Sequence, residues 1–129
     1  ISSSYDNTIR IWKLESSGSS RCLAKINTEE CVKTIVKFNS CMFLTSSNGD
    51  NIKVWSYNSK IPIQTMRGHT DSVTSLCMLT NEIFVSGSRD NTVKVWSIHK
   101  NQHMKDLTGH SGNINCLCRI EDDRFISGP

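Results

Sequence analysis

The sequence lacks the features that mark several classes of protein. It has only two prolines, and aromatic residues make up 7% of its 129 positions. No apolar run approaches the roughly 20 residues that a membrane-spanning helix needs, so we expect no membrane partner. The sequence also has no G-x-x-x-x-G-K or G-x-G-x-x-G loop, and no CxxC or Cys–His spacing typical of structural zinc. It therefore predicts no nucleotide, metal or other cofactor.

The charge and the cysteine content indicate which partners and which cellular compartment to expect. Lys and Arg number 15 against 12 for Asp and Glu, which gives a net charge of +3, and the basic residues are scattered singly. Scattered charge is a poor footprint for nucleic acid, so none is expected as a partner. Six cysteines without a preceding signal peptide predict reduced, buried or half-buried thiols in an intracellular protein. We expect the cytoplasm, with the nucleus as the alternative compartment.

Sequence markers repeat with one period along the whole chain. Residues 2–12, 45–55 and 86–96 read SSSYDNTIRIW, TSSNGDNIKVW and SGSRDNTVKVW, and their tryptophans lie 43 and 41 residues apart. Gly-His dipeptides begin at residues 68 and 109. Within each period, β-branched residues alternate with polar ones, and Asn, Asp, Gly and Ser supply turns. This pattern predicts four short antiparallel strands per period and no helix longer than a turn or two.

The order Gly-His, then Ser-Gly-Ser-x-Asp, then Trp resembles the WD40 repeat, one blade of a β-propeller. The best copy covers residues 68–96. The resemblance implies an all-β fold of four-stranded antiparallel meanders, arranged as an incomplete arc of a larger ring.

We expect residues 1–129 to form one partial propeller cut from a longer chain. The expected repeats are the end of one blade plus the start of the next at 1–26, a degenerate repeat at 27–67, the best-formed repeat at 68–108 and the start of a truncated repeat at 109–129.

Ser86, His69 and Asp90 are the residue types of a serine hydrolase triad, which makes an enzyme one interpretation. No G-x-S-x-G turn surrounds the serine, however, and part of the set recurs at His110 and Ser127. An active site is rarely duplicated in each repeat. We therefore predict no catalytic residues and no enzymatic activity.

The resemblance implies a structural role for the same residues. In the WD40 family, the His of the Gly-His loop bonds the Asp of the next tight turn and a hydroxyl on the intervening strand, which also accepts from the Trp indole. Here that network is His69, Asp90, Ser86 and Trp96, with Ser88 as the alternative hydroxyl.

One copy departs from this pattern. The repeat that ends at Trp55 has Asn27–Thr28 in place of Gly-His, and Gly49 in place of the turn Asp. We expect that blade to lack the hydrogen-bond network and to depend on packing.

The resemblance also implies a function. Short loops on rigid strands make a propeller rim a natural binding surface. The rim candidates are Tyr5, Asn48, Thr70, Asp71, Ser72, Arg89, Ser111 and Asn113. They predict a non-enzymatic protein–protein interaction scaffold that binds partner peptides or domains on the rim and contacts the remaining blades of the parent propeller.

Other functions fit the same resemblance. One is a substrate-recognition propeller of a ubiquitin ligase complex, and another is a regulatory propeller attached to a kinase or motor. RNA binding would need a basic, aromatic rim, for which the sequence offers only Tyr5 and Arg89 together.

Overall fold

β-Strands are the only regular secondary structure in the part that the computed structural model describes, residues 1–121 and 123–129. The first sheet contains β1 (Ser2–Ser4), β2 (Thr8–Leu14) and β3 (Ser20–Asn27). The second contains β4 (Val32–Lys37), β5 (Met42–Ser47), β6 (Ile52–Ser56) and β7 (Gln64–Met66). The third contains β8 (Val73–Met78), β9 (Ile83–Ser88), β10 (Val93–Ser97) and β11 (His103–Leu107). The last is the pair β12 (Cys116–Glu121) and β13 (Arg124–Gly128).

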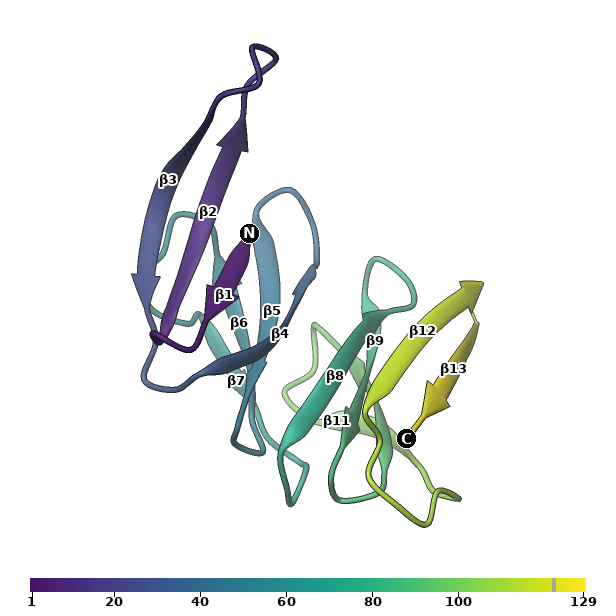
Figure 1. Ribbon diagram of the computed structural model, residues 1–129. Coiled ribbons are helices and arrows are strands. Elements are labelled where there is room, and N and C mark those ends of the chain that lie inside the picture. The colour runs from purple at the N-terminus through teal and green to yellow at the C-terminus, as the bar shows by residue number, and fades with distance from the viewer. Residues whose placement is uncertain (122) are drawn as a thin grey trace.

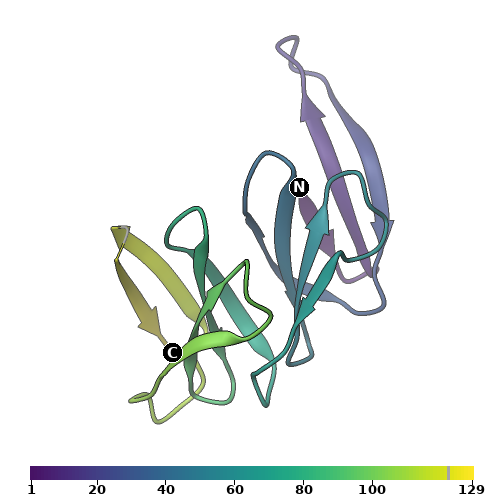
Figure 2. The ribbon, with the colours of Figure 1, turned by 180° about the vertical axis from the view of Figure 1, so that it is seen from behind.

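Each sheet is an antiparallel meander in which consecutive strands are neighbours. The four sheets follow one another in chain order and stand side by side like the ribs of a fan (Figure 1). Turned by 180°, the first and last sheets again lie at the two ends of an open array (Figure 2). The prediction of an all-β fold built from four-stranded antiparallel blades is confirmed.

Three apolar clusters hold the array together, one between each pair of consecutive sheets. Ile9 and Ile26 of the first sheet pack against Phe43 and Trp55 of the second. The second and third sheets share the largest cluster, whose buried members are Leu44, Ile52, Val54, Met66, Val73, Leu76, Phe84, Trp96 and Ile98. Val85 and Val93 of the third sheet meet Ile114, which precedes β12. The second and third sheets therefore bury one face against the sheet before and one against the sheet after, whereas the first and last sheets bury one face each.

The exposure of the three tryptophans reflects this stacking. Trp55 and Trp96 point toward the preceding sheet and are 2% and 0% exposed. Trp12 occupies the same place in the repeat but is 40% exposed, because no sheet covers that face of β2 among the described residues.

Gly87 shows how closely neighbouring sheets approach. A Cβ atom at Gly87 would lie 2.5 Å from Cγ2 of Ile114 and 2.7 Å from Oγ of Ser75. Any larger residue would push the last sheet away from the third, so the Ser-Gly of the repeat is a packing requirement.

The cysteines differ from expectation in their exposure. All six are free, but Cys22, Cys41, Cys116 and Cys118 are exposed, and only Cys31 and Cys77 are half-buried. Cys77 packs against the last sheet, whereas Cys118, its counterpart 41 residues later, lies on a face that no described strand covers.

In the described part of the chain, no helix is long and apolar enough to cross a membrane.

Candidate functional site

His69, Ser86, Asp90 and Trp96 form one chain of hydrogen bonds inside the third sheet. Nδ1 of His69 lies 2.6 Å from Oδ2 of Asp90, and its Nε2 lies 2.6 Å from Oγ of Ser86. The same hydroxyl accepts a hydrogen bond from the Trp96 indole at 2.7 Å. A neutral imidazole that donates from Nδ1 and accepts at Nε2 satisfies every one of these groups. The chain joins the β7–β8 loop, β9, the β9–β10 turn and β10.

The turn that carries Asp90 holds its carboxylate in place. Oδ1 of Asp90 accepts from the backbone and hydroxyl of Thr92 at 2.9 and 2.6 Å, and Oδ2 accepts from the backbone N–H of Thr70 at 3.1 Å. Asn91 adopts a left-handed φ of 67°, which asparagine tolerates better than most residues. A Cβ at Gly68, before His69, would lie 2.8 Å from Nδ1 of His103 and 3.0 Å from Cη2 of Trp96, so a larger residue would force these side chains to shift.

Burial of this network leaves no room for a substrate. Ser86 and Trp96 are 0% exposed, and His69 is 3% exposed. The Ser86 hydroxyl already contacts both the imidazole and the indole. Ser88, the alternative hydroxyl, is used elsewhere, because it donates to the carbonyl of Asp71 at 3.0 Å. The geometry of a triad is present, but the Ser86 hydroxyl is enclosed, donates to His69 and accepts from the Trp96 indole.

Each of the three tryptophans donates to a hydroxyl ten residues earlier. Trp12 bonds Ser2 at 2.8 Å, and Trp55 bonds Thr45 at 2.8 Å, matching the Trp96–Ser86 bond. The second sheet therefore keeps one link of the network that we expected it to lack entirely. What it lacks is the histidine. A serine or threonine stands ten residues before each tryptophan, and this spacing in the sequence would have predicted the three bonds.

The last sheet contains part of the same arrangement. Nε2 of His110 lies 2.7 Å from Oγ of Ser127, as His69 does from Ser86. His110 is exposed here, because β12 and β13 are the only described strands of that sheet.

Both ionisable members of the network have shifted pKa values. Burial lowers the pKa of His69 below its ordinary value, although the Asp90 carboxylate acts in the opposite direction. Burial alone would raise the pKa of Asp90, but hydrogen bonds from Thr92, His69 and the Thr70 backbone outweigh it and lower the pKa to about 2. At neutral pH the pair is therefore a neutral imidazole beside a carboxylate.

These shifts predict loss of stability in acid. Both groups bind protons less readily in the folded state than in the unfolded state. Their contribution to the free energy of unfolding is therefore fully present above about pH 6.5. It falls first as His69 is forced to protonate, and again as pH drops from about 4 toward the Asp90 value of about 2. We expect the melting temperature of the natural protein to decline between pH 7 and 5, and to decline less in H69Q. Equal slopes in the two proteins would contradict this account.

The residues predicted for the rim lie at one edge of the sheets. The turns containing Asp6–Asn7 and Asp90–Asn91 and the connections 28–31, 67–72 and 108–115 all lie at this edge, which we call the Asp–Asn edge, since the strands alternate in direction. The exposed candidates are Tyr5, Asn48, Thr70, Asp71, Arg89, Ser111 and Asn113. The connections 15–19, 38–41, 57–63, 79–82 and 98–102 lie at the opposite edge.

Ser72 differs from the other rim candidates because it is buried, with 5% exposure. Its hydroxyl donates to the carbonyl of Asn48 at 2.9 Å and accepts from Nζ of Lys33 at 3.2 Å. The β7–β8 loop folds back onto the second sheet at this point. Ser72 therefore ties two sheets together and presents no free hydroxyl to a partner.

One pocket at the Asp–Asn edge draws on all four sheets. It has a volume of about 480 Å³ and is lined by Ser3, Ser4, Tyr5, Val32, Lys33, Thr74, Arg89 and Asn115. We call it the four-sheet pocket. It includes Tyr5 and Arg89 from the predicted rim, but not the other candidates.

The repeat accounts for the residues of this pocket that the sequence analysis missed. Lys33, Thr74 and Asn115 are spaced by 41 residues, so they share one position of the repeat at the start of β4, β8 and β12. Tyr5 and Arg89 share a second position, just after β1 and β9. Two repeat positions thus converge on one hollow.

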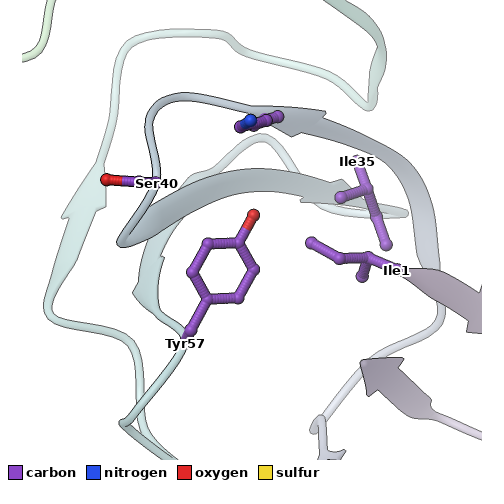
Figure 3. A pocket seen from close by; sticks show the side chains of 5 residues that line it. Ile1, Ile35, Ser40 and Tyr57 are labelled. Carbon is purple, nitrogen blue, oxygen red and sulfur yellow. The ribbon is translucent and has the colours of Figure 1, made fainter. Parts of the chain in front are cut away.

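The opposite edge has a hollow of a different kind. Figure 3 shows Tyr57 pointing toward Ile1 and Ile35, with Ser40 at the side. Burial raises the pKa of Tyr57, and the Cys41 thiolate adds to the effect. Among the residues that line this hollow, Lys37 has the one charged side chain. The lining comes from the first two sheets and their connections.

Comparison with known families agrees with this geometry. Residues 60–97, which contain β7 to β10 and the whole hydrogen-bond network, match the family described as "WD domain, G-beta repeat". This segment is a WD40 repeat. The predicted resemblance is confirmed, and the network belongs to that repeat.

The chain is also similar to curated proteins over part of its length. The chain is 35% identical to coatomer subunit beta'-2 of Arabidopsis thaliana over 77 residues, which is 59% of this chain and 8% of that protein. It is 30% identical to the target of rapamycin complex subunit wat1 of Schizosaccharomyces pombe over 78 residues, which is 59% of this chain and 24% of that protein. The chain thus matches less than a quarter of the length of these relatives.

Proposed function

We propose that this chain is a non-enzymatic protein-interaction scaffold, and that a partner peptide or domain binds at the Asp–Asn edge over the four-sheet pocket. The observation that supports this most is the convergence of all four sheets on one hollow. A ligand placed there contacts segments from residue 3 to residue 115 at once. Exposed side chains on rigid strands bind with little ordering cost.

Two further observations support a binding role. The serine, histidine and aspartate that could form a triad are enclosed and occupied, so they serve the fold. The names of the similar proteins describe subunits of larger assemblies, coatomer and a target of rapamycin complex. The free cysteines support an intracellular location for this protein.

Affinity purification of the tagged natural protein tests the proposal with two matched double variants. Tyr5→Ala with Asn115→Ala removes an exposed aromatic and an amide from the four-sheet pocket without changing charge. Ile61→Ala with Asn58→Ala removes an exposed apolar residue and an amide from the opposite edge.

We expect at least one co-purifying protein to fall by about fivefold or more with the first pair, since interface anchors typically contribute that much. The second pair should leave the same protein unchanged. If every partner is retained equally by both variants, the proposed binding site is wrong.

A further inference from the structure

The four-sheet pocket carries two cations and no carboxylate. Lys33 and Arg89 are its only charged lining residues, and both are exposed. Neither forms an ion pair with a carboxylate in the part of the chain that the structure describes. Other cations of the chain do pair, as Lys94 does with Asp106 at 2.7 Å and Lys53 with Glu29 at 3.5 Å. The pocket lining therefore carries two positive charges and no carboxylate that pairs with them.

Three acids of this edge, Asp6, Asp71 and Asp90, hydrogen-bond within their own turns or loop; Asp71 accepts from the backbone N–H of Ser72 at 2.6 Å. Asp90 holds Thr70, Thr92 and His69. Asp6 accepts from the backbone and hydroxyl of Thr8 at 3.1 and 2.6 Å. These carboxylates keep their charge, but they bind within their own turns and form no ion pair with Lys33 or Arg89 among the described residues.

Ser72 contacts the side chain of Lys33 and the backbone of Arg89. Its hydroxyl accepts from Nζ of Lys33 at 3.2 Å, and its carbonyl accepts from the backbone N–H of Arg89 at 3.0 Å. Ser72 itself is buried and bonded to the second sheet. A buried anchor thus holds two residues, 56 positions apart in sequence, at one site.

The remaining polar groups of the pocket suit an anion as well. The Tyr5 hydroxyl and the Asn115 amide are exposed and can donate hydrogen bonds. An ammonium, a guanidinium and neutral donors around one hollow are the groups that bind carboxylate or phosphate oxygens.

We propose that the four-sheet pocket binds an anionic side chain, a carboxylate or a phosphorylated residue, on a peptide segment of the partner. This rests on the proposed function and names the chemistry of the ligand at that site. A peptide fits better than nucleic acid, because the two cations form one local site and no extended basic track.

Three immobilised nonapeptide libraries test this with the natural protein. All share randomised flanks, and the central residue is fixed as serine, phosphoserine or glutamate. A fluorescent single-stranded oligouridylate serves as a fourth probe. Binding is measured for the wild type, Lys33→Ala, Arg89→Ala and Arg89→Lys, with Lys60→Ala as the control. Lys60 is an exposed lysine at the opposite edge.

We expect the wild type to retain one or both anionic libraries about tenfold more strongly than the serine library, as charge-assisted bonds allow. Lys33→Ala and Arg89→Ala should each remove most of this preference, Arg89→Lys should keep part of it, and Lys60→Ala should leave it intact. Retention of the phosphoserine library alone would identify phosphate as the source, and retention of both would allow a carboxylate. Melting temperatures should match the wild type in all variants, since both side chains are exposed.

Equal retention of all three libraries, or of none, would overturn the anion proposal. So would an equal loss with Lys60→Ala, or stronger binding of oligouridylate than of any library. These results leave the proposed function standing if the Tyr5 and Asn115 variant still loses a partner. If that variant loses none, the proposed function itself fails.

Discussion

Replacing Ser86 with alanine is expected to lower the free energy of unfolding by about 2–5 kcal/mol. The substitution removes one hydroxyl but leaves two buried groups without a partner, Nε2 of His69 and the Trp96 indole N–H. A buried polar group that loses its partner costs about 1–3 kcal/mol, because it has already lost its contact with water. Chemical unfolding of the natural protein, followed by tryptophan fluorescence, measures the effect.

Thr45→Ala is the matched control for this experiment. Thr45 occupies the same place in the second sheet, is also buried, and accepts from one indole only. It should cost about 1–3 kcal/mol, less than Ser86→Ala. Ser111→Ala, at an exposed position, should change stability by no more than about 0.5 kcal/mol. If Ser86→Ala unfolds like the wild type, or costs less than Thr45→Ala, the four-residue network does not stabilise the blade.

Residues 1–129 expressed alone are expected to self-associate. The outer face of the first sheet exposes Trp12, and Leu14 and Leu23 are 82% and 53% exposed. At the other end, Ile120 and Ile126 are 57% and 58% exposed. If each outer face leaves a few hundred Å² of apolar surface in water, at roughly 25 cal/mol per Å² the loss is about 5–10 kcal/mol per face. That is comparable to the stability of a typical domain.

Analytical ultracentrifugation should therefore show species heavier than 14.5 kDa. Changing Leu14, Leu23 and Ile126 to lysine should shift the distribution toward the monomer. A strictly monomeric wild-type segment with a sharp, cooperative melt would show that the two outer faces need no cover.

The repeat made most of the fold predictable. Its period and the alternation of β-branched residues placed the strands and turns, and the resemblance to a propeller implied that neighbouring sheets pack face to face. The resemblance to the WD40 repeat implied the hydrogen-bond network of His69, Ser86 and Asp90, which the structure brings within hydrogen-bond distance. These hydrogen bonds lie within one blade, so the residues that form them all occur within one period of the sequence.

Relations between blades were harder to predict. The sequence predicts Ser72 to be an exposed serine of a loop. In the structure it is buried, because the β7–β8 loop passes over the Asn48 carbonyl. In the sequence, nothing distinguishes Lys33 and Asn115 from other surface residues. The packing of the sheets brings them to one pocket. The contact between two sheets depends on how they stack, and that is a property of tertiary packing.

Hydrogen–deuterium exchange of the natural protein, with and without a co-purified partner, tests the central claim most directly. Partner binding at the four-sheet pocket predicts slower exchange in segments around residues 3–5, 32–33, 89 and 115, which lie far apart in sequence but line one hollow. Exchange in the opposite-edge connections 57–63 and 79–82 should not change. Protection confined to the opposite edge, with none at the four-sheet pocket, would contradict the account.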